Sequence, residues 1–359
     1  MAKILYGVMG NTYGHAIRSL AIASRMPDDD FYFIGGRRVP EVLGARYPVL
    51  DVPVLRIMHR RQRVDLPAVV GQIARRAIEI PSVVRRIRDL IDRWEPDIAF
   101  CDREFFLPLA CRRAGLRCIS INHSRILLGC RYPVPPTQWL SWALSVSHDR
   151  LLFDTMKEHI SVSFYGLPVK DAKRDVLFPP VLRPEVRLLE PTVGEHVLVY
   201  QTSPTFRRLL EPLARLRRPV IVYGMSGERL VEGNLTFKPF DSLGILEDLA
   251  SCAYAVVNGG HNLICEALYY RKPILCFPVA RLFEQFLNAF HVRELGYGEF
   301  STSQNPTVEI FDEFESRLEA YRASIEKAET DGTDLVVQRL NEIIGEELQQ
   351  RGSRDKVLS

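Results

Sequence analysis

Short apolar runs that alternate with helical patterns recur along the whole chain. The clearest example is the stretch 253–298, where an apolar run at 254–257 leads through Asn-Gly-Gly into a helical pattern that begins near His261. Continuous runs of Val, Ala and Ile are typical of parallel strands that helices cover on both faces. The pattern therefore predicts an α/β protein built on doubly wound parallel sheets.

The same alternation extends through both halves of the chain. A proline-rich and charge-rich stretch with little periodicity, 164–195, separates the halves and predicts a linker. Because 359 residues exceed one typical core, we expect domains at 1–165 and 166–334, with a C-terminal helix and tail at 335–359. The other strands are expected within 3–8, 31–36, 96–104, 118–124, 196–200, 219–224, 235–237 and 272–278.

Composition narrows the class of protein. Hydrophobic residues at 47% and charged residues at 25% are ordinary globular values, and a net charge of +3 is too small to indicate nucleic-acid binding. The seven cysteines lack C-x-x-C spacing, so we expect reduced packing residues. No signal-peptide pattern opens the chain and no apolar run approaches the roughly 20 residues of a membrane span, so we expect a cytoplasmic protein.

The turn at 258–260 predicts an anion site. Free backbone N–H groups and the positive end of the helix dipole point to one spot there, and the glycines let a phosphate come close. Glu266 lies further along the same helix, in reach of a ribose if a diphosphate lies at the N-terminus. A second helix opens at Phe283, and its Gln285 and Asn288 share a face.

These residues resemble the donor site of GT-B glycosyltransferases. The shared elements are Gly-Gly, an acidic residue six positions later, a proline-bounded strand, Glu-Gln-x-x-Asn-Ala at 284–289 and Leu-Gly-Tyr-Gly at 295–298. The stretch is similar to the macrolide and plant UDP-glycosyltransferases and to the N-acetylglucosaminyltransferase that makes lipid II. An ordinary βαβ unit with solvated polar residues is the alternative.

The resemblance implies both a fold and a reaction. It implies two Rossmann-like domains that face a cleft, with a C-terminal helix that returns to the first domain. It also implies inverting transfer of a sugar from a nucleotide diphosphosugar, expected to be a UDP-sugar, to a hydroxyl of a small molecule, glycan or lipid-linked acceptor. The helix at Gly260 would stabilise the leaving diphosphate, so neither a metal nor another cofactor is expected. A GT-B epimerase or hydrolase and a non-catalytic sugar-nucleotide-binding protein are the alternatives.

A set of residues is expected to bind the donor. Thr202 and Ser203 could contact phosphate or simply cap the helix before Pro204. Three departures from relatives (Asn258, Leu263 and Glu284) leave the donor sugar open. The donor-binding candidates are Gly14, Thr202, Ser203, Phe240, Ile245, Asn258, Gly259, Gly260, His261, Asn262, Glu266, Glu284 and Gln285.

The loop after the first strand holds the expected general base. By resemblance His15 takes this role, and Asp102 at the end of another strand orients it, since a histidine base works best with a partner that fixes its tautomer. Alternatively, His15 caps its helix or contacts the diphosphate, and Asp102 caps the helix that begins near Glu104.

The acceptor side has weaker candidates. Glu104 and His123 are reserve bases, while Trp139 and Trp142 form either an apolar acceptor surface or part of a core. The adjacent His148 and Asp149 are expected to point apart and to make a poor dyad.

The stretch 56–93 is unusually basic, with apolar residues at helical spacing. Two interpretations stay open: peripheral contact with anionic lipid at the inner face of the membrane, or a solvated arginine face. The same arginines could also steer an anionic acceptor toward the protein.

Overall fold

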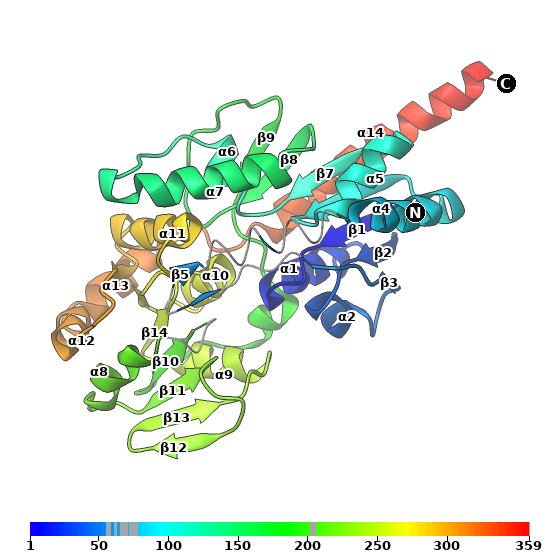
Figure 1. Cartoon of the computed structure of the whole chain (residues 1–359). Helices are drawn as coiled ribbons and strands as arrows, with labels where there is room; N and C mark the ends of the chain where they lie inside the picture. The colour runs from blue at the N-terminus through cyan, green and yellow to red at the C-terminus, as the bar shows by residue number, and fades with distance from the viewer. Residues whose placement is uncertain (55–58, 61–62, 65–70, 72–77, 202–205, 359) are drawn as a thin grey trace.

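Two parallel sheets organise the chain, as the alternation of strands and helices predicts (Figure 1). The computed structural model describes residues 1–54, 59–60, 63–64, 71, 78–201 and 206–358. Within these residues each of the two sheets has seven strands, and a short antiparallel pair, β4 (His59–Arg60) and β5 (Arg63–Val64), lies apart from them. The prediction of an α/β fold with doubly wound sheets is confirmed.

The first sheet positions one side of the functional site. Its strands are all parallel, and the strand order changes direction between β1 and β6. In doubly wound sheets, ligands bind outside the carboxyl ends of the strands at such a point. The order is β3 (Val49–Leu50), β2 (Asp30–Ile34), β1 (Lys3–Val8), β6 (Ile98–Asp102), β7 (Cys118–Ile121), β8 (Glu158–Val162) and β9 (Asp175–Phe178).

The second sheet repeats this arrangement. Its order changes direction between β10 and β14, and only its edge strand β12 is antiparallel among the described strands. The order is β12 (Leu230–Glu232), β13 (Leu235–Lys238), β11 (Val220–Tyr223), β10 (Val197–Tyr200), β14 (Tyr254–Val257), β15 (Ile274–Cys276) and β16 (Gly298–Phe300).

Helices cover both faces of each sheet. The first domain contains α1 (Tyr13–Ala23), α2 (Arg38–Leu43), α4 (Ile80–Trp94), α5 (Phe106–Ala114), α6 (Ile126–Gly129) and α7 (Trp139–Leu152). The second contains α8 (Leu210–Ala214), α9 (Gly244–Ser251), α10 (His261–Tyr269), α11 (Phe283–Glu294), α12 (Val308–Glu315) and α13 (Leu318–Ile325). The 3₁₀ turns are η1 (Pro136–Gln138), η2 (Pro184–Leu188) and η3 (Arg207–Leu209).

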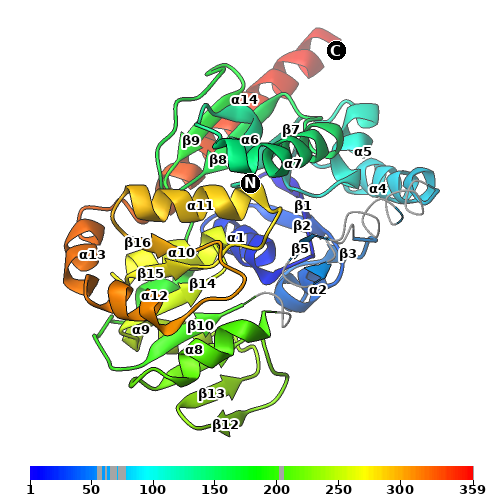
Figure 2. The ribbon, with the colours of Figure 1, turned by 60° about the vertical axis from the view of Figure 1, so that its left-hand side comes forward.

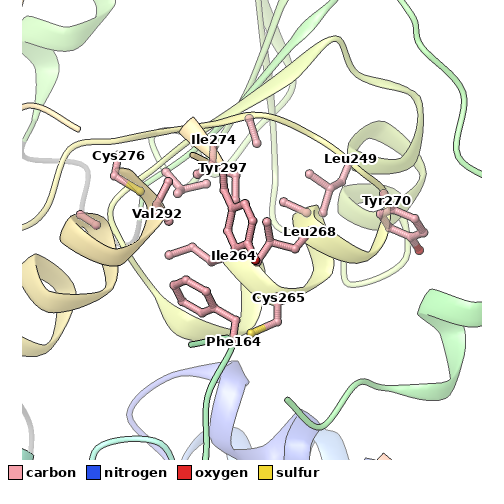
Figure 3. Packing of buried hydrophobic residues seen from close by; sticks show 14 of the residues in the cluster. Phe164, Leu249, Ile264, Cys265, Leu268, Tyr270, Ile274, Cys276, Val292 and Tyr297 are labelled. Carbon is pink, nitrogen blue, oxygen red and sulfur yellow. The ribbon is translucent and has the colours of Figure 1, made fainter. Parts of the chain in front are cut away.

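Successive residues of the central strands pack to opposite faces of the sheet. In β14, Ala255 and Val257 face the cluster formed with α9, α10 and α11, whereas Val256 faces the cluster formed with α12 and α13. Figure 3 shows the first cluster, with Ile264 of α10 near Val292 of α11. Burial on both faces explains why the strand sequence is apolar throughout.

The C-terminal helix α14 (Thr333–Leu358) returns to the first domain. Its apolar residues, among them Val336, Leu340 and Ile343, belong to the same buried cluster as Ile4 of β1 and Ala16 of α1. The helix, red in Figure 1, runs along the first sheet. The crossing helix that the resemblance implies is therefore present.

The stretch expected to be a linker contains a strand. β9 pairs in parallel with β8, so the first sheet extends past residue 165 to Phe178. Neither strand shows the continuous apolar pattern, because β8 includes Glu158 and His159 and β9 is an edge strand. The boundary between the domains at residue 165 stays a prediction. The first sheet nevertheless includes β9, which lies beyond this boundary in the sequence.

Two further sequence-based expectations concern the interior and the membrane. All seven cysteines are free, and six of them are buried, which confirms that they are packing residues. None of the helices in the described part of the chain combines the length and the apolar composition that crossing a bilayer requires.

Candidate functional site

A cavity of about 530 Å³ lies between the two domains. The first domain contributes α1, α7 and the loops after β1 and β7, and the second contributes α10 and the start of α11. Figure 2 shows α1 beside α10, and a hydrogen bond from Asn262 Nδ2 to the Gly14 carbonyl joins them at 2.8 Å. The cavity is therefore at the carboxyl ends of the strands where both sheets change direction, as expected for this class of fold.

His15 and Asp102 meet at the wall of this cavity. His15 lies in the first turn of α1, and its Nδ1 is 2.8 Å from Asp102 Oδ1. The parallel pairing of β1 and β6 places Val8 opposite Asp102, so the loop after β1 passes over the end of β6. The imidazole lines the cavity, whereas the carboxylate is fully buried behind it.

Arg18 completes this group, and the sequence analysis missed it. Its Nε and Nη2 donate to the Asp102 carboxylate at 2.7–2.9 Å. Burial opposes ionisation of Asp102, but the charges of Arg18 and His15 outweigh burial and lower the pKa of Asp102. The available signal was the spacing of Arg18 from His15, which is three residues and therefore one turn of helix.

Arg18 also reaches the second domain. Its Nη1 donates to Asn262 Oδ1 at 3.2 Å, and Asn262 in turn donates to Gly14. The group His15–Asp102–Arg18, called group A below, is therefore connected by hydrogen bonds to the first turn of α10.

The turn before α10 has the geometry that an anion site needs. Gly259 has φ +83°, and a Cβ there would lie 2.6 Å from the Gln285 carbonyl oxygen, so only glycine fits. Gly260 is the N-cap residue, and it lines the cavity with the first residues of α10, whose backbone N–H groups have no partner within the helix. Asn258 and His261 line the cavity on either side of this turn.

His123 packs tightly between the domains. Its Nδ1 is 2.8 Å from the Val162 carbonyl and its Nε2 is 2.8 Å from Asn288 Oδ1. Its ring stacks on that of His261, with centroids 3.8 Å apart, and burial lowers the pKa of both imidazoles. Since both nitrogens already have partners, His123 is a poor candidate for a base, although it lines the cavity.

Glu266 is paired with an arginine that the sequence analysis did not consider. Arg183, which comes from the connection between the sheets, donates to both Glu266 oxygens at 2.8 and 3.2 Å and to the Ser242 carbonyl at 2.9 Å. Burial raises the pKa of Glu266, and the charge of Arg183 acts in the opposite direction. The pair fixes the orientation of the carboxylate at the cavity wall.

The start of α11 closes the cavity. Gln285 Oε1 accepts a hydrogen bond from the Val279 N–H at 3.0 Å, and Ser124 donates to Glu284 across the domains. Phe240, from the turn before α9, stacks on Tyr13 of α1 with ring centroids 4.2 Å apart. The contacts of Ser124 with Glu284 and of Tyr13 with Phe240 join the two domains beside the cavity.

A second group with a histidine, an aspartate and an arginine lies at α7, which supplies the histidine and the aspartate. Contrary to expectation, His148 and Asp149 do not point apart: His148 Nδ1 is 3.0 Å from Asp149 Oδ1. Arg103 holds Asp149 through two hydrogen bonds, at 2.9 and 2.8 Å, and this pull on the carboxylate explains the difference. The group His148–Asp149–Arg103 is called group B below, and all three residues line the cavity.

Three of the acceptor candidates lie elsewhere. Glu104 is buried away from the cavity and accepts a hydrogen bond from the Leu107 N–H, so it caps α5. Trp139 is 61% exposed, and Trp142 packs beside the core and donates to the Tyr132 hydroxyl at 3.2 Å. These three side chains do not line the cavity, because α7 turns its Leu144–His148 face to it instead. Their place in an acceptor site stays a prediction.

The remaining candidates divide between the cavity and the parts of the chain that are not described. Thr202 and Ser203 lie outside the described residues, as do residues 56–58, 61–62, 65–70 and 72–77 of the basic stretch 56–93. Gly259 lies behind the lining. The predicted residues that line the cavity are Gly14, His15, His123, Phe240, Ile245, Asn258, Gly260, His261, Asn262, Glu266, Glu284 and Gln285. Over the described part of the chain, no three His, Cys, Asp or Glu residues come together as metal ligands.

Comparisons with known proteins show the family to which the chain is similar. Residues 2–319 match the model of a family described as "Glycosyl transferase family 1". An "Uncharacterized glycosyltransferase" of Methanosarcina acetivorans is 24% identical over 384 residues, which cover 96% of this chain and 99% of the relative.

Solved structures share the fold over nearly the whole length. The spinosyn forosaminyltransferase SpnP has a TM-score of 0.64 at 17% identity, with 96% of this chain and 99% of that chain covered. Phytolacca americana UGT2 complexed with UDP-2fluoro-glucose and pterostilbene has a TM-score of 0.65 at 11% identity, with 96% and 99% covered. These likenesses establish the GT-B fold.

Proposed function

The chain belongs to glycosyl transferase family 1, and from this membership we propose that it is an inverting enzyme that moves a sugar from a UDP-sugar to an acceptor hydroxyl. The observation that supports this proposal best is the contact of His15 with the buried Asp102 in a cavity that also receives the N-terminus of α10. A base and an anion site therefore face the same space.

His15 is the general base in this proposal. Asp102 accepts a hydrogen bond from the Nδ1–H of the ring, so Nε2 is the nitrogen that can take a proton. The acceptor oxygen gives its proton to Nε2 and forms a bond to the anomeric carbon. The bond from that carbon to the diphosphate breaks on the opposite face, and its electron pair leaves with the diphosphate.

The N-terminus of α10 stabilises the leaving group. The developing negative charge lies against the backbone N–H groups after Gly260 and the positive end of the helix dipole. This arrangement performs the task without requiring a metal ion.

The second domain binds the donor in this proposal. Glu266, held by Arg183, accepts hydrogen bonds from the ribose hydroxyls, and the turn at Phe240 and Ile245 borders the base. Glu284 and Gln285 face the sugar. A donor with a uridine base is supported by the likeness to the Phytolacca americana protein, which was solved with a UDP-sugar analogue.

Product analysis tests the reaction. Purified protein is incubated with UDP-sugars, with and without a panel of acceptors, and UDP release, product mass and the anomeric configuration of the product are measured. We expect acceptor-dependent UDP release and inversion at the anomeric carbon. Retention, or equal turnover of the donor without any acceptor, would contradict the proposal.

The Glu266→Ala variant tests the donor site. Loss of hydrogen bonds to a charged group should weaken UDP binding by roughly 1.5–3 kcal/mol, measured by calorimetry. The surface variant Glu232→Ala, on the exposed strand β12, is the control and should bind UDP normally. Unchanged UDP affinity in Glu266→Ala would remove this residue from the site.

A further inference from the structure

Group B occupies the wall of the cavity that the first domain forms. Its His148 is 29% exposed and lines the cavity together with Leu144 and Ser145. These two residues precede His148 by four and three positions, so all three lie on one face of α7. None of them takes part in the proposed reaction or in donor binding.

The remainder of group B fixes the tautomer of His148. The Arg103 guanidinium donates to both Asp149 oxygens and lies over the Phe153 ring, 4.6 Å from its centroid. Burial opposes ionisation of Asp149, but the charge of Arg103 and the contact with His148 lower the pKa of Asp149. An ionised carboxylate can only accept, so Nδ1 of a neutral His148 holds the proton and donates it to Asp149.

The other ring nitrogen then becomes a hydrogen-bond acceptor. With Nδ1 protonated, Nε2 of the neutral imidazole presents a lone pair on a ring that lines the cavity. The positive Arg103 and the negative Asp149 form two hydrogen bonds with each other, so their opposite charges balance and this pair has no excess positive charge with which to attract a phosphate or carboxylate. Its chemistry matches an O–H donor.

We propose that His148 binds an acceptor hydroxyl other than the one that reacts, so that the enzyme selects polyhydroxylated acceptors such as sugars and glycosides. This inference rests on the proposed function. Ser145, one turn earlier on the same face, offers a second partner for such an acceptor. An acceptor with a single hydroxyl leaves these polar groups without partners, and sites built to bind hydroxyls reject such compounds.

The test compares two acceptor classes on two variants. The polyhydroxylated class consists of monosaccharides, disaccharides and methyl glycosides, and the other class consists of phenol and simple alkanols. His148→Phe keeps a ring but removes the acceptor nitrogen, whereas His148→Gln keeps an oxygen that can accept. We expect His148→Phe to lower kcat/KM for polyhydroxylated acceptors about 3- to 10-fold, mainly through KM. His148→Gln should restore part of the loss, and UDP affinity should stay unchanged in both variants.

A binding measurement separates failure of this inference from failure of the proposed function. Saturation-transfer NMR with methyl glycosides and UDP reports acceptor binding even if no transfer occurs. Glycosides that bind the wild type and bind His148→Phe less well support the role of His148. Three results would each overturn this role of His148. The first is an equal loss for both acceptor classes, the second is a wild type that uses alkanols but rejects every polyhydroxylated compound, and the third is a wild type that binds no glycoside. A fall in kcat equal to that of His15→Ala, with KM unchanged, would instead make His148 a base.

Discussion

Groups A and B have the same three residue types but are assembled differently. In group A the histidine and aspartate are 87 residues apart and are brought together by two paired strands. In group B they are neighbours on one helix, and the distant partner is Arg103, 46 residues away. The histidine–aspartate contact therefore arises once from the topology of a sheet and once from two neighbours on a helix, while Arg103 reaches group B from the end of β6.

The second difference concerns the second domain. Group A is connected to it through the contact of Arg18 with Asn262, whereas the hydrogen bonds described for group B all lie within the first domain. The position of the second domain therefore affects the surroundings of His15 directly. This difference is why we place the reacting hydroxyl at His15 and a binding hydroxyl at His148.

Replacement of His15 should have the largest effect. Loss of a general base lowers the rate about 100- to 10,000-fold, so His15→Ala should nearly abolish transfer while UDP affinity barely changes. Asp102→Asn should lower the rate less. Because the two residues act as a unit, the rate of the double variant should be little lower than that of His15→Ala alone. Single-turnover kinetics measures the rate of transfer, and calorimetry measures the UDP affinity. Near-normal turnover in His15→Ala would show that the two groups have been assigned the wrong way round.

Removal of either arginine should destabilise the fold strongly. Arg18→Met and Arg103→Met each leave a buried carboxylate without its partner, which costs about 3–5 kcal/mol in the free energy of unfolding. Arg215→Met, at an exposed pair with Glu211, is the control and should cost about 1 kcal/mol or less. Urea denaturation measures all three, and a small effect for Arg103 would show that group B is held together by other contacts.

Local patterns account for what the sequence predicted correctly. The strand–turn–helix at Tyr254–Tyr269 depends on glycines and on an apolar run that burial on both faces requires, so its boundaries match the structure. The contact of His15 with Asp102 followed from two strand ends, because the carboxyl ends of parallel strands meet at one edge of a sheet.

The arginines could not be found in this way. The partner of Glu266 lies 83 residues away in an irregular segment, and nothing local distinguishes Arg183 from an exposed arginine. His148 and Asp149 were misjudged because Cβ directions on a helix were used without the side-chain rotation that Arg103 imposes. The sequence could not show which face of α7 lines the cavity, because the rotation of this helix about its axis depends on tertiary packing.

Glu104 follows Asp102 of group A and Arg103 of group B directly in the chain. Its carboxyl group should make the free energy of unfolding depend on pH. Burial raises the pKa of Glu104 to about 7, although the backbone N–H groups of α5 act in the opposite direction. The folded protein therefore keeps a proton that the unfolded chain, with a pKa near 4.5, releases. The contribution of Glu104 to the free energy of unfolding is complete below about pH 4.5 and is lost as the pH rises through about 7.

Glu104→Gln tests this dependence. The variant should remove a change on the order of 3 kcal/mol in the free energy of unfolding between these pH values. Urea midpoints at pH 5 and pH 7.5 measure it, with the exposed Glu232→Gln as control. If the variant keeps the full pH dependence, a group other than Glu104 causes it.

The smallest effect is expected at the link between group A and the second domain. Asn262→Ala removes the contacts with Arg18 and with the Gly14 carbonyl, each worth about 0.5–1.5 kcal/mol, and should raise the donor KM severalfold without unfolding the protein. Because group B lies outside this link, the effects of Asn262→Ala and His148→Phe on kcat/KM should add to within about 0.5 kcal/mol in a double-mutant cycle. A larger coupling energy would mean that closure of the domains acts on both groups. His148 would then belong to the same cooperative unit as His15.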